Sequence, residues 1–241
     1  NNRPDIIGDK AIADTANAWK DNTTEEQRNS STNNTLIGLN LSANKTNSLI
    51  FPTRGYRINT IIENGNAFPY LFSKIGNTEF DNPLYYKVVF NTSYFFPYYE
   101  SNKNALGTKF IIGNIHTYEG NNFDIPINQR FTAGGSNSVR GWGSRELVPT
   151  GNEIPVNIEG RPIEELNALF FRNTLPGGFF WLEGSFETRN RIWQDMGGAL
   201  FVDYGNVWNR PKDFRWNRIA IAAGFGLRYY TSFAPFRIDV G

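Results

Sequence analysis

The chain has 241 residues, a length that suits a single β domain, because barrels and sandwiches of more than 200 residues commonly fold as one unit. Its 24 Lys and Arg residues balance 23 Asp and Glu residues, so the composition does not support nucleic-acid binding. The absence of cysteine excludes disulfides, thiol catalysis and thiolate metal sites, and the single histidine, His116, leaves no basis for a multi-histidine metal site.

The first part of the chain, residues 1–33, is polar and rich in Asn, Asp and Thr. It holds one helix-compatible piece, residues 11–20, which lacks a sustained apolar face. We expect an exposed loop or a disordered lead-in here, followed by a folded domain at 34–241. No uninterrupted apolar run approaches the roughly 18 residues that a membrane helix needs.

From Leu36 onward, apolar and polar residues alternate with a period of two, which predicts β-strands. In the clearest case, Phe180, Leu182 and Phe186 lie on one face, whereas Glu183 and Glu187 lie on the other. The pattern predicts about eight strands and no intervening helix, with the runs lying at 35–43, 56–63, 86–96, 108–118, 180–191, 200–208, 219–229 and 236–240.

Alternation is typical of soluble sandwiches as well as membrane barrels, but three details favour a barrel. The runs approach the roughly 9–11 residues that cross a membrane at a tilt. The polar faces carry charges in mid-strand, whereas the apolar faces carry none. Aromatic residues also lie toward the strand ends, as expected at membrane interfaces, and include Tyr98, Tyr99, Trp181, Trp208, Tyr229 and Tyr230. We therefore predict an all-β fold, an antiparallel transmembrane β-barrel.

A long, glycine-rich connection lies at about 119–178 and contains Val139, Arg140, Gly141 and Trp142 in succession. This tetrad resembles the outer-membrane protein assembly factor superfamily, which includes BamA- and TamA-type barrels, the bacterial surface antigen family and two-partner secretion transporters. In that superfamily an extracellular loop folds into the barrel lumen and carries a Val-Arg-Gly-aromatic sequence. The resemblance implies that 119–178 is such an inward-folded, lumenal loop.

Two later segments resemble further motifs of the same superfamily. Residues 184–187 resemble its Gly-x-x-Glu strand, and residues 201–205 resemble its Phe-x-Asp-x-Gly strand. The resemblance implies that Glu187 and Asp203 face the lumen and bind Arg140, and the alternation independently places both on the polar face. The similarity extends over residues 36–241.

The chemistry of the tetrad agrees with this interpretation. Arg140 would lose hydration inside a lumen, and two carboxylates would replace that hydration with charge-assisted hydrogen bonds. Gly141 would let the loop pass close to the wall, and Trp142 would fill the gap beside it. The alternative is that Arg140 only braces the barrel with an ion pair.

The resemblance implies a non-enzymatic barrel of the bacterial outer membrane that aids insertion of outer-membrane proteins by strand pairing and local membrane destabilisation. Its expected partners are membrane lipids, unfolded outer-membrane proteins, and other assembly subunits or a second copy, without a cofactor, a metal or nucleic acid. A polypeptide exporter of the two-partner secretion type, or a small pore or anchor, stays open as an alternative. Family barrels have more strands, so the chain is either the C-terminal part of a larger barrel or a small barrel.

Overall fold

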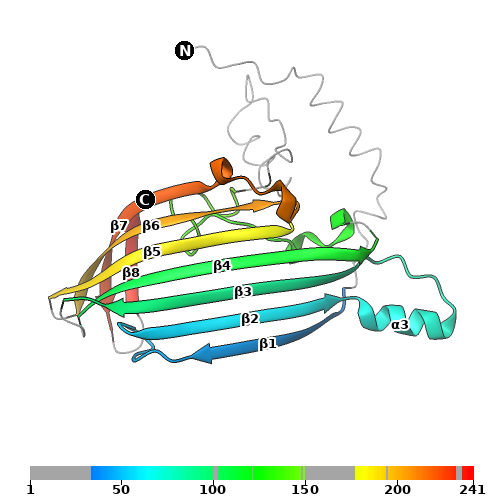
Figure 1. Cartoon of the computed structure of the whole chain (residues 1–241), viewed down its shortest axis with the longest axis horizontal. Coiled ribbons are helices and arrows are strands. Elements are labelled where there is room, and N and C mark those ends of the chain that lie inside the picture. Colours follow the sequence, from blue (N-terminus) through cyan, green and yellow to red (C-terminus); the bar gives the residue numbers. More distant parts are fainter. Residues whose placement is uncertain are drawn as a thin grey trace, which may run out of the picture. The chain divides into compact units, whose positions relative to one another are not determined.

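The computed structural model describes residues 34–99, 103–120, 122–147, 149, 177–193, 195–231 and 235–241. The lead-in predicted at 1–33 lies outside them. Eight strands form one antiparallel sheet in which each strand pairs with its neighbours in the sequence (Figure 1). They are β1 (Leu36–Asn44), β2 (Gly55–Gly65), β3 (Leu84–Pro97), β4 (Asn104–Glu119), β5 (Phe180–Trp193), β6 (Met196–Trp208), β7 (Ala220–Tyr230) and β8 (Pro235–Val240). The predicted all-β, antiparallel architecture with about eight strands is confirmed.

The sheet is open, with β1 and β8 as its two edge strands. Six of its strands, β2 to β7, have between 11 and 16 residues. At roughly 3.3 Å per residue, strands of this length are long enough to cross a bilayer at a tilt.

The two faces of the sheet differ in polarity, and the arrangement is the reverse of that in a soluble protein. On what we call the outer face, large apolar side chains are exposed, among them Leu200, Phe225 and Leu227. On the inner face, polar and charged side chains such as Asp203 and Arg228 are buried. This inverted distribution is expected of a barrel wall, because lipid solvates the outer face and the inner polar groups bind one another.

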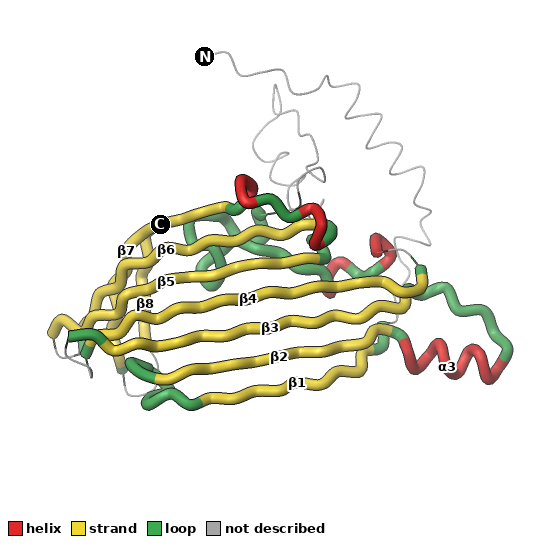
Figure 2. Tube along the Cα trace, in the orientation of Figure 1, coloured by secondary structure: helices red, strands yellow, loops and turns green. Residues whose placement is uncertain are grey.

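A short helix interrupts the strands, contrary to the prediction that none would. It is α3 (Ala67–Gly76), which lies between β2 and β3 (Figure 2). The strand interpretation overlooked the helical spacing of its apolar residues, Phe68, Leu71, Phe72 and Ile75. The described part of the chain contains no helix that is both long and apolar enough to cross a membrane.

Of the six aromatic residues expected at membrane interfaces, only Tyr98, Tyr99 and Tyr229 are exposed. Trp181 packs against the buried core, and Tyr230 lies on the inner face, because their strand positions turn them inward. Trp208 is buried as well, since its ring packs with those of Phe180 and Phe214. The prediction that they are exposed at a membrane interface was therefore wrong for Trp181, Trp208 and Tyr230.

The buried core lies where the β4–β5 connection packs against the sheet. It contains residues of that connection, such as Phe131 and Val139, together with Ile115 of β4 and Val207 of β6. Val139 is fully buried there. Apolar packing therefore holds the connection against the inner face and places the residues next to Val139 beside the charged side chains of the wall.

Candidate functional site

The β4–β5 connection turns back on itself between residues 133 and 147. Ala133 and Leu147 form an isolated bridge, and the Gly135 amide donates to the Trp142 carbonyl at 2.9 Å. Gly135 has a φ of 102°, a backbone conformation that residues other than glycine rarely adopt. The turn between these residues presents Arg140 to β5, β6 and β8.

Arg140 uses the whole hydrogen-bonding capacity of its guanidinium group. Its Nε and Nη2 donate to the two carboxylate oxygens of Asp203 at 2.7 and 2.9 Å. Nη1 donates to Glu187 at 2.7 Å and to Asp239 at 3.2 Å, and Nη2 also reaches Ser185 Oγ at 3.4 Å. These five contacts match the five N–H donors of a guanidinium, whereas the three donors of lysine would not suffice.

Among these carboxylates, Asp203 accepts the most hydrogen bonds. In addition to the side-chain contacts, it accepts a hydrogen bond from the Arg140 backbone amide at 3.1 Å. Ser185, which lies opposite Asp203 in the β5–β6 pairing, donates to it at 2.6 Å. Asp203 is completely buried, so this carboxylate depends on these partners for the interactions that water would otherwise provide.

The Arg140 guanidinium also lies over an aromatic ring. Its Cζ is 3.4 Å from the ring centroid of Phe201, which is on the inner face of β6 two residues before Asp203. Stacking of this kind favours arginine because the guanidinium is planar and weakly hydrated.

Three further arginines share the acidic partners of Arg140, namely Arg189, Arg228 and Arg237. Glu187 lies 2.8 Å from Arg189 Nε and 3.3 Å from Arg228 Nη2, and Arg228 also binds Asp239. Arg237 pairs with Asp239 at 3.9 Å, so four arginines surround three carboxylates. Removal of one member would leave an uncompensated charge in a site where Arg140 is only 7% exposed.

We use the name Arg140 cluster for Arg140 with Asp203, Glu187 and Asp239. It joins one turn of the connection to three strands of the sheet. The structure thus brings together three residues singled out in the sequence, Arg140, Glu187 and Asp203. Sequence reasoning missed Asp239 as a partner, although the alternation of β8 would have placed it on the same face as Arg237.

The structure places the other two tetrad residues differently from each other. A Cβ atom added to Gly141 would lie 2.8 Å from the Cβ of Ala222 on β7, so the close approach expected of this glycine is present. Trp142 was expected to fill the gap beside Gly141, but its side chain is 39% exposed.

The described residues contain no group of three or more His, Cys, Asp or Glu side chains arranged to hold a metal ion. The single histidine, His116, lies on β4 with its ring 5.5 Å from that of Tyr86. The chemistry available in the Arg140 cluster is therefore ion pairing and hydrogen bonding between the connection and the wall.

Comparison with known proteins agrees with this geometry. Residues 6–241 match the model of the Omp85 superfamily domain. Among solved structures, the chain resembles BamA from Haemophilus ducreyi lacking POTRA domains 1–3, with a TM-score of 0.60 and 18% sequence identity. The match covers 85% of this chain and 38% of that chain, so the sequence spans well under half the length of this structural relative.

Proposed function

The chain belongs to the Omp85 superfamily, a family of outer-membrane barrels for protein assembly and translocation, and from this premise we propose that it aids the insertion of outer-membrane proteins. It does so as an integral barrel of the bacterial outer membrane, without enzymatic activity. Its partners are membrane lipids and unfolded outer-membrane proteins, together with other assembly subunits or a second copy of the chain.

The observation that carries the proposal is the docked position of the β4–β5 connection. Arg140 binds side chains from β5, β6 and β8, so one residue of the connection ties three strands to each other. Rigid packing alone would not require an arginine whose five N–H donors all have acceptors. We infer that the Arg140 cluster holds the wall in the shape that accepts a substrate strand.

The faces of the sheet support a membrane role for this wall. The apolar outer face would contact lipid, whereas the connection covers part of the inner face. A substrate strand gains backbone hydrogen bonds when it pairs with a strand edge, which offsets the cost of bringing unpaired amides into lipid. Local thinning of the bilayer beside the wall would lower the barrier to this step.

An exporter that passes a polypeptide through the lumen is the second candidate from the sequence. Val139 is fully buried and Arg140 is nearly so, which means that the connection would have to leave the inner face before a chain could pass. We therefore favour insertion over export.

Reconstitution tests the proposal. The full chain is placed in liposomes, an unfolded outer-membrane barrel is added, and the rate at which that substrate becomes protease-resistant is compared with the rate in empty liposomes. We expect acceleration by the native chain, strong loss of acceleration with Arg140→Ala, and partial loss with Arg140→Lys, which keeps the charge but not the two-point contact with Asp203.

Arg210→Ala is the matched control, because Arg210 forms an exposed pair with Asp213 and should not affect the rate. The absence of any acceleration by the native chain would refute the insertion function. Acceleration that survives in Arg140→Ala would refute only the role of the Arg140 cluster.

A further inference from the structure

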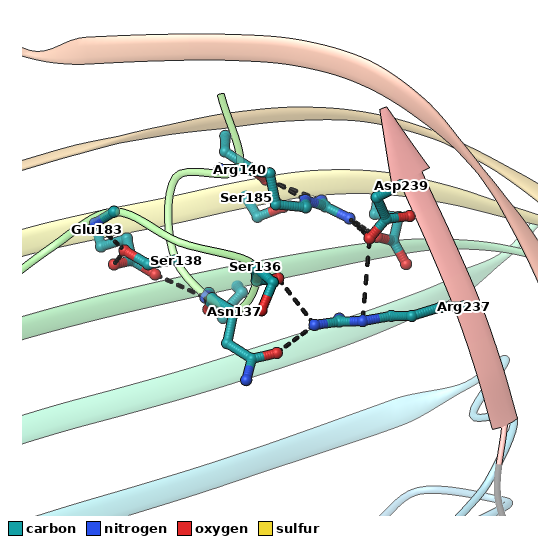
Figure 3. A network of polar contacts seen from close by, with 12 residues as sticks. Ser136, Asn137, Ser138, Arg140, Glu183, Ser185, Arg237 and Asp239 are labelled. Carbon is teal, nitrogen blue, oxygen red and sulfur yellow. Dashed lines mark hydrogen bonds and ion pairs between the residues drawn. The ribbon is translucent and has the colours of Figure 1, made fainter. Parts of the chain in front are cut away.

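A second polar cluster contacts the β4–β5 connection two residues before Arg140 (Figure 3). We propose that Ser138, Glu183 and Lys109 form a separate positioning site for this connection, which we call the Glu183 cluster. The inference goes beyond the proposed function, since docking of the connection can be measured without any insertion substrate.

Glu183 is the centre of this cluster. Its side chain on β5 is 1% exposed, so it has lost nearly all contact with solvent. One carboxylate oxygen accepts from Lys109 Nζ of β4 at 2.7 Å, and the other accepts from the Ser138 hydroxyl. The wall thus satisfies one oxygen and the connection satisfies the other. Undocking of the connection would remove a hydrogen bond from a buried charge, which is costly.

Ser138 is oriented for this contact by its own turn. Its Oγ accepts from the Gly134 amide at 2.9 Å. Because a hydroxyl group has a single proton, that proton remains available for Glu183. The fold of the connection therefore presents a hydrogen-bond donor to the wall at this point.

Lys109 reinforces the same attachment. Besides Glu183, its ammonium group donates to the Asn137 carbonyl of the connection at 2.9 Å. One lysine thus neutralises the buried carboxylate and holds the adjacent backbone of the turn. Two charge-assisted hydrogen bonds in all cross from the wall to the connection here, one through Ser138 and one through Asn137.

The two clusters differ in composition and are linked through Arg237, which donates to the Asn137 side chain and pairs with Asp239 at 3.9 Å (Figure 3). They share no residue, and only the Arg140 cluster draws on β6 and β8. Glu183 and Glu187 lie four residues apart on β5, which corresponds to about 13 Å along a strand. Val139, fully buried in the apolar core, separates the two points of attachment in the connection. The link through Arg237 allows the two clusters to be coupled, so the coupling is measured by combining substitutions from both.

Thiol labelling measures docking directly, because the chain has no cysteine of its own. In Val139→Cys, the single thiol is buried while the connection is docked and reacts with a maleimide only after undocking. With the full chain in liposomes, we expect the double substitution Lys109→Met and Glu183→Gln to raise the labelling rate about tenfold, through loss of the charge-assisted hydrogen bonds. The double substitution leaves no unpaired charge behind.

Arg237→Gln is the comparison for a more exposed contact with the same turn, made from β8. Arg237 donates to the Ser136 carbonyl at 2.8 Å and to the Asn137 side chain, and it pairs with Asp239 at 3.9 Å. Its side chain is 41% exposed, so its loss should raise the rate less than about threefold. If the double substitution labels no faster than the Val139→Cys reporter alone, the Glu183 cluster does not position the connection.

Combination with Arg140→Ala tests whether the sites are separate. Independent sites predict that the two increases in labelling rate multiply, whereas a single site predicts no further increase over Arg140→Ala alone.

If the double substitution prevents folding, Ser138→Ala removes one hydroxyl and keeps both charges, with an expected increase of about fivefold. An unchanged rate in that variant would overturn the proposal. Failure of the insertion assay with normal labelling would count against the proposed function and leave this inference intact.

Discussion

Along β6, neighbouring residues turn to opposite faces and meet opposite surroundings. Leu200 and Val202 are exposed on the outer face, whereas Phe201 and Asp203 between them are buried on the inner face. An apolar side chain is thus exposed where a soluble protein would bury it, and a carboxylate is buried where a soluble protein would expose it. Each face is therefore adapted to its own surroundings, which are lipid on the outer face and polar side chains that bind one another on the inner face.

The largest expected effect comes from disruption of the inner face at Asp203. Asp203→Asn keeps the shape of the side chain but removes the charge that faces Arg140, so Arg140 loses the carboxylate that binds it at two points. We expect the free energy of unfolding to fall by about 3–5 kcal/mol, the range for breaking one partner of a buried pair. Denaturant titration of the protein in lipid or detergent measures it.

Asp213→Asn is the matched control, because it removes a carboxylate from an exposed pair with Arg210. It should cost no more than about 1 kcal/mol. Equal losses for the two substitutions would mean that the inner face does not depend on charge pairing.

The outer face is tested by the reverse change, the addition of a charge. Val202 lies in the middle of β6, so Val202→Arg would place a guanidinium near the centre of the bilayer. The expected loss is about 2–4 kcal/mol in the free energy of unfolding from lipid, because a charge at the midplane is poorly solvated. Tyr229→Arg, near the end of β7, should cost at most about 1 kcal/mol. If position along the strand made no difference, the outer face would not be in contact with lipid.

A smaller effect is expected where the connection meets the inner face at Gly141. In Gly141→Ala the new Cβ would approach the Cβ of Ala222 to 2.8 Å, which should weaken docking by about 1–3 kcal/mol. The labelling rate of the Val139→Cys reporter measures this loss. Ala222→Gly in the same chain removes the clashing atom and should restore much of the docking. If the second substitution failed to restore docking, close contact with β7 would not be the reason for a glycine at this position.

Much of the fold could be predicted from the sequence because the strand signal is local. Alternation with a period of two runs through each long strand, and it places Glu187 and Asp203 on the same polar face. Helix α3 was missed because a short apolar segment carries too few turns to distinguish the two periods. Trp208 was misplaced because burial by Phe214, which follows the strand, cannot be predicted from alternation within it.

The two clusters of the inner face differ in how much the sequence could say about them. For the Arg140 cluster, the resemblance of the tetrad and of two strand motifs to the superfamily implied that Arg140 binds Glu187 and Asp203, and Arg140 lies 2.7 Å from each of these carboxylates. For the Glu183 cluster no motif was available. Lys109 and Glu183 are 74 residues apart, and Ser138 is one of many serines in polar segments.

The sequence by itself determined the strands and the polarity of their faces, because these depend on residue spacing along one chain segment. The arginine among carboxylates was implied by the resemblance of its motifs to those of the superfamily. Only the tertiary structure decided that Asp239 completes the set around Arg140 and that Glu183, Lys109 and Ser138 hold the connection at a second point. Those contacts depend on the curvature of the sheet and on the path of the β4–β5 connection across it. Both arise from packing between residues far apart in the chain, a property that local patterns do not contain.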